Sequence, residues 1–430
     1  MIIYKKGTMY FEGKNVENLA KRYGTPFFLF SEHALRQNYR DFVKFFSSGY
    51  KNIRVDFSVK TDYEKSVLKV LNDEGSCAEI VAAFELKLLE NIGFSSQRVI
   101  FDGPCKVDSE LTYCMKRGIH AFYADSLGEL VRLDKLAGKM GIKVNVGLRV
   151  NLDIKGILND LAYRYVSKFG VSYDEALEGL IKVKNLKNIQ IIALSTHVGS
   201  QMLTPDSYLK AVDMLTLLAK KLKSAGINIS EINLGGGYPS QTLIKTTLPR
   251  LIFSNLGILH EKKPTPLKEF GQKISKRFAQ RTKEHGLENI ILAFQPGRSI
   301  SSNMGVAVAR VWVVKKKWVF VDVSTSSIPE SILFAQRRII PVKKKYGAKK
   351  RYNIAGKGLN SVDNFAIGEA FPEIKEGDLM VVLDAGAYSI SRANRFTTLN
   401  PPVYMIREGG TLQMVRRGET FKDVLGPMEF

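Results

Sequence analysis

The sequence is poor in the residues that hold disulfide frameworks and structural metals. It contains three cysteines (Cys77, Cys105 and Cys114) and five histidines among 430 residues. The cysteine spacing is not that of a metal site, and an odd number of cysteines does not form a disulfide framework. Free thiols are typical of a reducing compartment. We therefore expect a cytoplasmic protein without a metal site.

Long apolar runs are also lacking. The first six residues, MIIYKK, do not begin a signal peptide, because no continuous apolar stretch follows them. No apolar run in the sequence approaches the length that crosses a membrane. We expect a protein that does not depend on a membrane.

Acidic residues are scarce relative to basic ones: 42 Asp and Glu stand against 64 Lys and Arg, a net charge of +22. A field of this sign can attract nucleic acid, an acidic membrane or an acidic protein. The basic runs are dispersed without interleaved aromatics, and no nucleic-acid-binding motif accompanies them. A solvated basic surface and an acidic carrier protein remain the two open interpretations, and we do not expect nucleic acid.

A regular alternation of strands and helices begins near residue 55. Amphipathic helical stretches separate eight apolar segments, which are residues 55–60, 77–81, 98–102, 120–124, 144–150, 191–197, 230–235 and 290–294. This rhythm predicts an α/β fold with a parallel (β/α)8 TIM barrel. An open doubly wound sheet is the alternative, but its site residues would gather at one switch point rather than follow strands along the whole series.

The length of the chain and a change in its sequence pattern predict a second domain. A chain of 430 residues exceeds one ordinary core. After about residue 298, short β-rich segments separated by turn signals replace the helical periodicity. We expect residues 31–298 to form the barrel, residues 299–430 to form an all-β domain, and residues 1–30 to join that domain.

Lys60 ends the first strand of the series, Val55–Lys60, and its amine would point toward the carboxyl end of that strand. Most lysines lie on solvated surfaces, so an ordinary surface residue is the first interpretation. A lysine with a pKa lowered by burial or by neighbouring cations can instead form an imine with an aldehyde. Three later strand ends decide between these interpretations.

Those strand ends carry groups that suit a phosphate and an aromatic ring. Gly235–Gly237 would let backbone N–H groups approach a phosphate, although most glycine runs are simple turns. Gly297 and Arg298 would add N–H groups and a positive charge. His197 could lie flat against a planar ring, although a lone histidine is more often a core residue. Together with Lys60, they predict a pyridoxal phosphate site.

The chain resembles the alanine-racemase-fold group of pyridoxal phosphate enzymes, and within it the diaminopimelate and ornithine decarboxylase branch. The resemblance extends from about Pro26 to Met405. Its motifs occur in the family's order: Phe57–Lys60, Phe101–Pro104, Leu148–Asn151, Ser167–Gly170, His197–Gln201, the triple glycine, Pro296–Arg298 and Asp384–Tyr388.

This resemblance implies a pyridoxal phosphate-dependent amino acid decarboxylase of biosynthesis, a homodimer whose active sites are built from both chains. It implies that Lys60, His197 and Asp363 are catalytic, with Lys60 holding the cofactor covalently and His197 stacked on its ring. The further cofactor-binding residues implied are Ser200, Gly236, Gly237, Gln295, Gly297, Arg298 and Tyr388. The implied substrate-binding residues are Arg149, Asn360 and Ser361.

The sequence departs from the family pattern at its chemical centre. Gln295 stands where the family has an acidic residue, whose carboxylate keeps the ring nitrogen protonated and makes the ring an electron sink. An amide carries no charge, so we expect a weaker sink and a slower reaction. The motif that follows Lys60 is also altered, since Thr61 and Asp62 replace a small residue and asparagine.

A second departure concerns the return of a proton. Leu359 replaces a cysteine that is thought to act from the partner subunit, and leucine has no proton to give. Asn360 stands where ordinary decarboxylases have an acidic substrate-binding residue. Ser361, or a water held by Asp363, could replace the missing donor.

Three functions remain open from the sequence. The first is decarboxylation of an amino-acid-type substrate, free or bound to a carrier protein. The second is a homologue that binds the cofactor or a partner but has lost turnover, as Gln295 and Leu359 suggest. The third is racemase-like chemistry, which tolerates a poor electron sink but needs a second base opposite Lys60.

Overall fold

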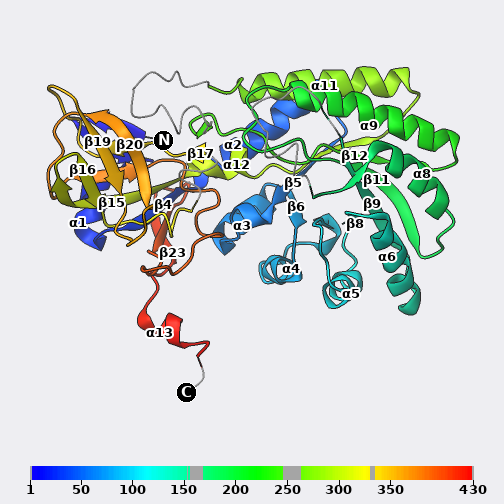
Figure 1. Ribbon diagram of the computed structural model, residues 1–430, viewed down its shortest axis with the longest axis horizontal. Coiled ribbons are helices and arrows are strands. Elements are labelled where there is room, and N and C mark those ends of the chain that lie inside the picture. The colour runs from blue at the N-terminus through cyan, green and yellow to red at the C-terminus, as the bar shows by residue number, and fades with distance from the viewer. Residues whose placement is uncertain (1, 153, 155–167, 246–262, 330–334, 429–430) are drawn as a thin grey trace. The chain divides into compact units, whose positions relative to one another are not determined.

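The computed structural model describes residues 2–152, 154, 168–245, 263–329 and 335–428 (Figure 1). Ser167 of the predicted motif set lies outside these residues. The chain divides into two compact units. One comprises Tyr39–Pro239 and Pro264–Gly297, and the other comprises Met1–Asn38, Ser240–Lys263 and Arg298–Phe430.

The first unit is a closed barrel of eight parallel strands. Its strands are β5 (Ile53–Ser58), β6 (Cys77–Ile80), β7 (Val99–Phe101), β8 (Ala121–Ala124), β9 (Val144–Asn151), β11 (Ile189–Ser195), β12 (Glu231–Asn233) and β14 (Ile291–Phe294). Pairing of β8 with β9 and of β14 with β5 closes the ring. The short strand β10 (Val171–Ser172) pairs in parallel with the end of β9. The predicted parallel (β/α)8 barrel is therefore confirmed.

Amphipathic helices alternate with these strands and surround them (Figure 1). They are α3 (Lys65–Asp73), α4 (Ala83–Glu90), α5 (Asp108–Lys116), α6 (Leu127–Lys139), α8 (Tyr173–Val183), α9 (Asp206–Ser224) and α11 (Leu267–Glu284). On α9, Leu215, Leu218 and Leu222 are buried at helical spacing, whereas Lys220 and Lys223 are exposed. The exposed lysines of α9 contribute to the basic surface.

The second unit is built mainly of strands. It contains β1 (Ile2–Lys5), β2 (Thr8–Phe11), β3 (Lys14–Asn15), β4 (Phe27–Ser31), β13 (Ile244–Lys245), β15 (Gly305–Lys315), β16 (Trp318–Val321), β17 (Ala335–Gln336), β18 (Ile339–Pro341), β19 (Lys350–Ala355), β20 (Asn364–Phe371), β21 (Leu379–Val382), β22 (Val403–Ile406) and β23 (Leu412–Arg416). Helices α1 (Val16–Tyr23), α12 (Arg298–Ser301) and α13 (Phe421–Leu425) accompany them. Helix α2 (Glu32–Phe46) begins in this unit, and the Ser31 hydroxyl accepts the Ala34 N–H at its start.

The N-terminal strand β4 lies inside this sheet. It pairs antiparallel with β15 and parallel with β22, and all five of its residues are buried. Phe27 and Leu29 pack there with Val306, Val308 and Val381. The separate all-β domain predicted from the sequence is confirmed. The residues of strand β20 show no clear alternation of buried and exposed positions, so periodicity alone does not identify this strand.

The first barrel strand begins and ends two residues earlier than its sequence pattern suggested. β5 ends at Ser58, and Val59–Thr61 form a single 3-10 turn, η1, that is closed by the Asp62 N–H on the Val59 carbonyl. Lys60 therefore follows the strand within this turn rather than forming its last residue. The difference arises because Val59 is apolar and β-branched, which favours a strand locally.

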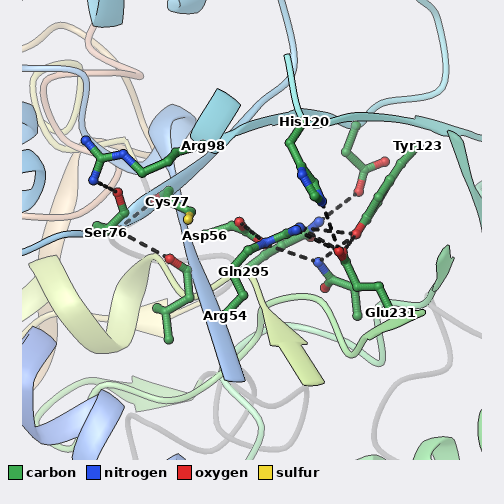
Figure 2. A network of polar contacts seen from close by, with 12 residues as sticks. Arg54, Asp56, Ser76, Cys77, Arg98, His120, Tyr123, Glu231 and Gln295 are labelled. Carbon is green, nitrogen blue, oxygen red and sulfur yellow. Dashed lines mark hydrogen bonds and ion pairs between the residues drawn. The ribbon is translucent and has the colours of Figure 1, made fainter. Parts of the chain in front are cut away.

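A buried polar network crosses the barrel interior (Figure 2). Arg54 donates to both carboxylate oxygens of Glu231, at 2.6 and 2.7 Å, and to Asp56 at 2.8 Å. The Tyr123 hydroxyl and His120 also contact the Glu231 carboxylate. Burial raises the pKa of Asp56 to about 6, against the opposing effect of Arg54. Burial would also raise the pKa of Glu231, but Arg54 and His120 lower it below its usual value.

We expect the Asp56 carboxyl to make the stability of the barrel depend on pH. The folded-state pKa of about 6 exceeds the value of about 4 in an unfolded chain. The stabilisation from the protonated form is therefore complete below about pH 4 and is lost as the pH rises to about 6. In Asp56→Asn this loss is absent. The unfolding free energy of the variant minus that of the wild type should therefore rise by up to about 3 kcal/mol as the pH increases from about 4 to about 7.

Urea denaturation at a series of pH values measures this difference. Glu288→Gln, which removes an exposed carboxyl before β14, serves as the control and should follow the wild-type profile. A difference between Asp56→Asn and the wild type that stayed constant from pH 4 to 7 would contradict the prediction.

Candidate active site

Lys60 forms an ion pair at the carboxyl end of the barrel. Its ammonium lies 2.7 and 2.6 Å from the two carboxylate oxygens of Glu79, the last residue but one of the neighbouring strand β6. Glu79 is buried and also accepts a hydrogen bond from the Ser58 hydroxyl. The Lys60 side chain is 42% exposed, so its amine can be reached by a ligand. Chemistry in barrels of this kind takes place at this end.

Acidic residues occupy three successive strand ends. Glu79 lies on β6, Asp102 follows β7 and Asp125 follows β8, and all three are buried. Arg149 on β9 lies 3.8 Å from Asp102 and 3.9 Å from Asp125. No role for these acids was predicted from the sequence. An acidic residue at the end of an otherwise apolar strand, repeated over three strands, was the signal that could have found them.

His197 follows β11 and carries a neutral imidazole. Burial, followed by the positive charges of Arg149 and Lys60, lowers its pKa to about 3. The Gly236 N–H donates to its Nδ1 atom at 3.2 Å, so Nδ1 carries no proton. A neutral flat ring of this kind suits stacking against an aromatic cofactor.

The triple glycine is required by close packing of three strand-end loops. A Cβ on Gly235 would lie 2.4 Å from the Thr196 carbonyl oxygen, and one on Gly236 would lie 2.5 Å from that of Gln295. Gly237 has φ +93°, and its Cβ would lie 2.0 Å from the Gly199 carbonyl oxygen. The Gly237 N–H has no acceptor among the described residues. A backbone donor left over at this turn fits a phosphate group.

We expect Gly237→Ala to destabilise the barrel more than an alanine at an open glycine does. Gly226 is the matched control, since it has φ +82° but no atom within 4 Å of its Cβ position. Gly226→Ala should cost about 1 kcal/mol from backbone strain alone. Gly237→Ala should cost about 1 to 3 kcal/mol more, because its methyl group overlaps the Gly199 carbonyl. Chemical denaturation of both variants measures the difference, and equal losses would show that the overlap is relieved.

The loop after β14 completes the barrel face. Gln295 is 7% exposed, and its backbone N–H donates to the Gly235 carbonyl oxygen at 2.9 Å. Its side-chain Nε2 lies 3.3 Å from Asp102 Oδ2. A Cβ on Gly297 would lie 2.0 Å from the hydroxyl of Thr61, the residue after Lys60. Within the barrel unit, the structure thus brings most of the predicted cofactor residues to the carboxyl ends of the strands.

Arg298 and Tyr388 lie together in the β unit. The Arg298 guanidinium is stacked 4.7 Å from the centre of the Tyr388 ring. Arg337 is buried, and its guanidinium donates to the carbonyl oxygens of Asp384 at 3.0 Å and Ala387 at 2.6 Å. Arg337 therefore fixes the turn that presents Tyr388, which has φ +53°.

Asp363 anchors a loop of the β unit. Its carboxylate accepts hydrogen bonds from the Ser324 hydroxyl, the Thr325 N–H and the Gly358 N–H, at 2.7 to 2.9 Å. The loop that it holds is exposed, including Asn360 and Ser361. Leu359 is 92% exposed, which is unusual for a large apolar side chain.

The fold and the barrel face define a class of enzyme. A closed parallel barrel that presents an accessible lysine, a neutral histidine and a glycine turn with a spare N–H is suited to an aromatic aldehyde that carries a phosphate. Pyridoxal phosphate is the cofactor of this kind. Residues 33–302 match the family described as "Pyridoxal-dependent decarboxylase, pyridoxal binding domain", and the chain belongs to this family.

Known proteins resemble the chain over nearly its whole length. It is 28% identical to the diaminopimelate decarboxylase of Aquifex aeolicus, over 99% of this chain and 96% of that protein. It is 29% identical to that of Pseudomonas aeruginosa, over 98% and 97%. The crystal structure of the diaminopimelate decarboxylase of M. jannaschii has the same fold, with a TM-score of 0.88 at 22% identity over 100% of this chain and 98% of that one.

Neither a membrane-spanning helix nor a metal-binding cluster occurs among the described residues. These residues contain no helix that is both long enough and apolar enough to cross a membrane. They also contain no group of three or more His, Cys, Asp or Glu side chains that could hold a metal ion.

Proposed function

We propose that the chain decarboxylates an amino acid, with diaminopimelate as the first substrate to test. The observation that carries the proposal is the barrel face on which Lys60, paired with Glu79, lies among the residues that fit pyridoxal phosphate. The full-length similarity to diaminopimelate decarboxylases supports the choice of substrate. Crystal structures of the M. jannaschii and Helicobacter pylori relatives with L-lysine support an amino acid.

The roles of the barrel residues follow from their positions. Bound pyridoxal phosphate supplies an aldehyde for attachment and a ring that accepts the electrons of the broken carboxyl bond. Lys60 would attach the cofactor, and Glu79 would hold the amine in place and take up its proton. His197 would pack its neutral ring against that of the cofactor, and Gln295 would contact the ring nitrogen. Ser200, Gly236, Gly237, Gly297, Arg298 and Tyr388 would hold the phosphate.

The loop at residues 357–362 is proposed to act in a homodimer. Its exposure, and above all that of Leu359, suits insertion into the active site of a partner subunit. Asn360 and Ser361 would then contact the substrate together with Arg149. Asp363 would keep this loop in place through its hydrogen bonds. Ser361 carries the hydroxyl on this loop that could return a proton to the substrate. Size-exclusion chromatography with light scattering tests the dimer.

We also propose a compartment, a role for each domain and a partner protein. We propose a cytoplasmic enzyme in which residues 31–298 bind the cofactor while residues 1–30 and 299–430 form the β domain. The net charge of +22 suits an acidic carrier protein that would present a bound substrate. A binding homologue without turnover is the second candidate, and it is favoured by Gln295 and Leu359.

Carbon dioxide release tests the proposed reaction. The protein, loaded with pyridoxal phosphate, is incubated with carboxyl-labelled diaminopimelate, lysine and ornithine, free and as carrier-bound amino acids. We expect release of labelled carbon dioxide from at least one of them at a rate typical of enzymes, on the order of 1 per second or faster. No release from any substrate would favour the homologue without turnover. Deuterium entry at Cα without carbon dioxide would instead indicate a racemase.

A further inference from the structure

An amide and a carboxylate meet across the mouth of the barrel. Gln295 follows β14 and Asp102 follows β7, and β5 and β6 lie between these two strands in the ring. The Gln295 Nε2 atom lies 3.3 Å from Asp102 Oδ2, and the two side chains are only 7% and 5% exposed. Lys60 follows β5, so this pair lies on the same face as the proposed cofactor attachment.

The chemistry of the pair fixes the direction of the amide. An ionised carboxylate only accepts hydrogen bonds, so Gln295 must turn its NH2 group toward Asp102. Its carbonyl oxygen, Oε1, is then left as the acceptor for a donor on the other side. A bond from the NH2 group to an anion polarises the amide and makes that oxygen a stronger acceptor.

Asp102 is held in its ionised form. Its Oδ1 atom accepts the Gly103 N–H at 2.7 Å and lies 3.8 Å from the Arg149 guanidinium. Burial would raise the pKa of Asp102, but Arg149, Lys106 and Lys60 lower it below its usual value. The barrel mouth thus contains a permanent negative charge one hydrogen bond away from Gln295.

We propose that Asp102 and Gln295 together replace the acidic side chain that the family places at position 295. Asp102 carries the negative charge, and the Gln295 carbonyl oxygen accepts the hydrogen bond of the protonated ring nitrogen of pyridoxal phosphate. Asp102 is then a positioning residue that acts through Gln295. This inference rests on the proposed function, because it requires that Gln295 would contact the ring nitrogen of bound pyridoxal phosphate.

The protonation of the ring nitrogen can be observed directly. The protein is loaded with pyridoxal phosphate labelled with 15N in the ring, and the nitrogen resonance is recorded by NMR. We expect the wild-type resonance on the protonated side. Asp102→Asn and Gln295→Leu should each move it toward the position of unprotonated pyridine. The double variant Asp102→Asn/Gln295→Glu should return it, because it places the charge at position 295.

Asp125→Asn is the matched control. Asp125 is also buried and lies 3.9 Å from Arg149, but it has no hydrogen bond to Gln295 among the described contacts. Its replacement should leave the nitrogen resonance unchanged. The same shift of the nitrogen resonance in Asp125→Asn and Asp102→Asn would overturn the inference. A general change of the electrostatic field in the barrel would then explain both shifts.

The apoprotein gives a second test that needs no cofactor. Gln295→Glu alone would place two carboxylates at hydrogen-bonding distance, which is unfavourable when both are ionised. We expect this variant to melt at a lower temperature than the wild type, and the added Asp102→Asn to recover at least half of the loss. Additive effects of the two substitutions would contradict a direct pair.

Failure of the proposed function and failure of the inference about Asp102 and Gln295 can be told apart. A wild-type protein that keeps no cofactor after borohydride reduction would overturn the proposed function and this inference with it. A retained cofactor with a nitrogen resonance that does not respond to Asp102→Asn or Gln295→Leu would overturn only the inference.

Discussion

Replacement of Lys60 by alanine should abolish covalent retention of pyridoxal phosphate and slow decarboxylation at least about a thousandfold. The amine of Lys60 is the nucleophile that we propose for attachment of the aldehyde, and it lies against Glu79. Borohydride reduction of the loaded protein, followed by mass spectrometry of the intact chain and of its peptides, measures the retention. Labelled carbon dioxide measures the rate.

Two further variants separate chemistry from folding. Lys60→Arg keeps a cation beside the buried Glu79 carboxylate, but a guanidinium forms no stable bond to the aldehyde. It should therefore fold like the wild type and still lose the cofactor on denaturation. Lys69→Ala removes an exposed lysine from α3 and should retain the cofactor fully. Covalent label found on Lys60→Arg at the wild-type level would show that another lysine holds the cofactor.

Replacement of Arg54 by methionine should lower the unfolding free energy by about 3 to 5 kcal/mol. Arg54 neutralises Asp56 and Glu231 in the barrel interior, at 2.6 to 2.8 Å. Both carboxylates are buried, so the loss of the guanidinium removes the largest opposing charge from each of them. Guanidinium chloride denaturation at neutral pH measures the loss.

An exposed ion pair provides the comparison for Arg54. Arg117 contacts Glu90 at 2.7 Å on the surface, and Arg117→Met should cost no more than about 1 kcal/mol. The double variant Arg54→Met/Glu231→Gln should lose less than Arg54→Met, because one buried charge fewer is left unpaired. A loss for Arg54→Met as small as that for Arg117→Met would mean that water reaches the network.

The sequence identified the barrel because its signals are local. Eight apolar segments at regular spacing, separated by helices with a charged face, require nothing beyond the period of side chains along a strand or a helix. The same holds for Gly235–Gly237, a glycine run that directly follows an apolar segment. The end of β5 was misplaced by two residues, because Val59 favours a strand whether or not it forms one.

The sequence also identified single residues without their partners. Lys60 and His197 were selected because each follows an apolar strand. Their roles, like those of the other predicted site residues, stay predictions that the experiments above address. The local pattern could not show that Glu79 pairs with Lys60, or that Arg337 supports the turn before Tyr388.

By itself, the sequence determined the fold class, the family and the positions of the chemical groups along the chain. Only the tertiary structure decided which of these groups meet. Asp102 and Gln295 are 193 positions apart, and Arg54 and Glu231 are 177 apart, yet each pair is in contact. Closure of the barrel brings distant strand ends onto one rim and distant strand interiors into one core. That closure depends on the pairing of all eight strands, and no short stretch of sequence encodes it.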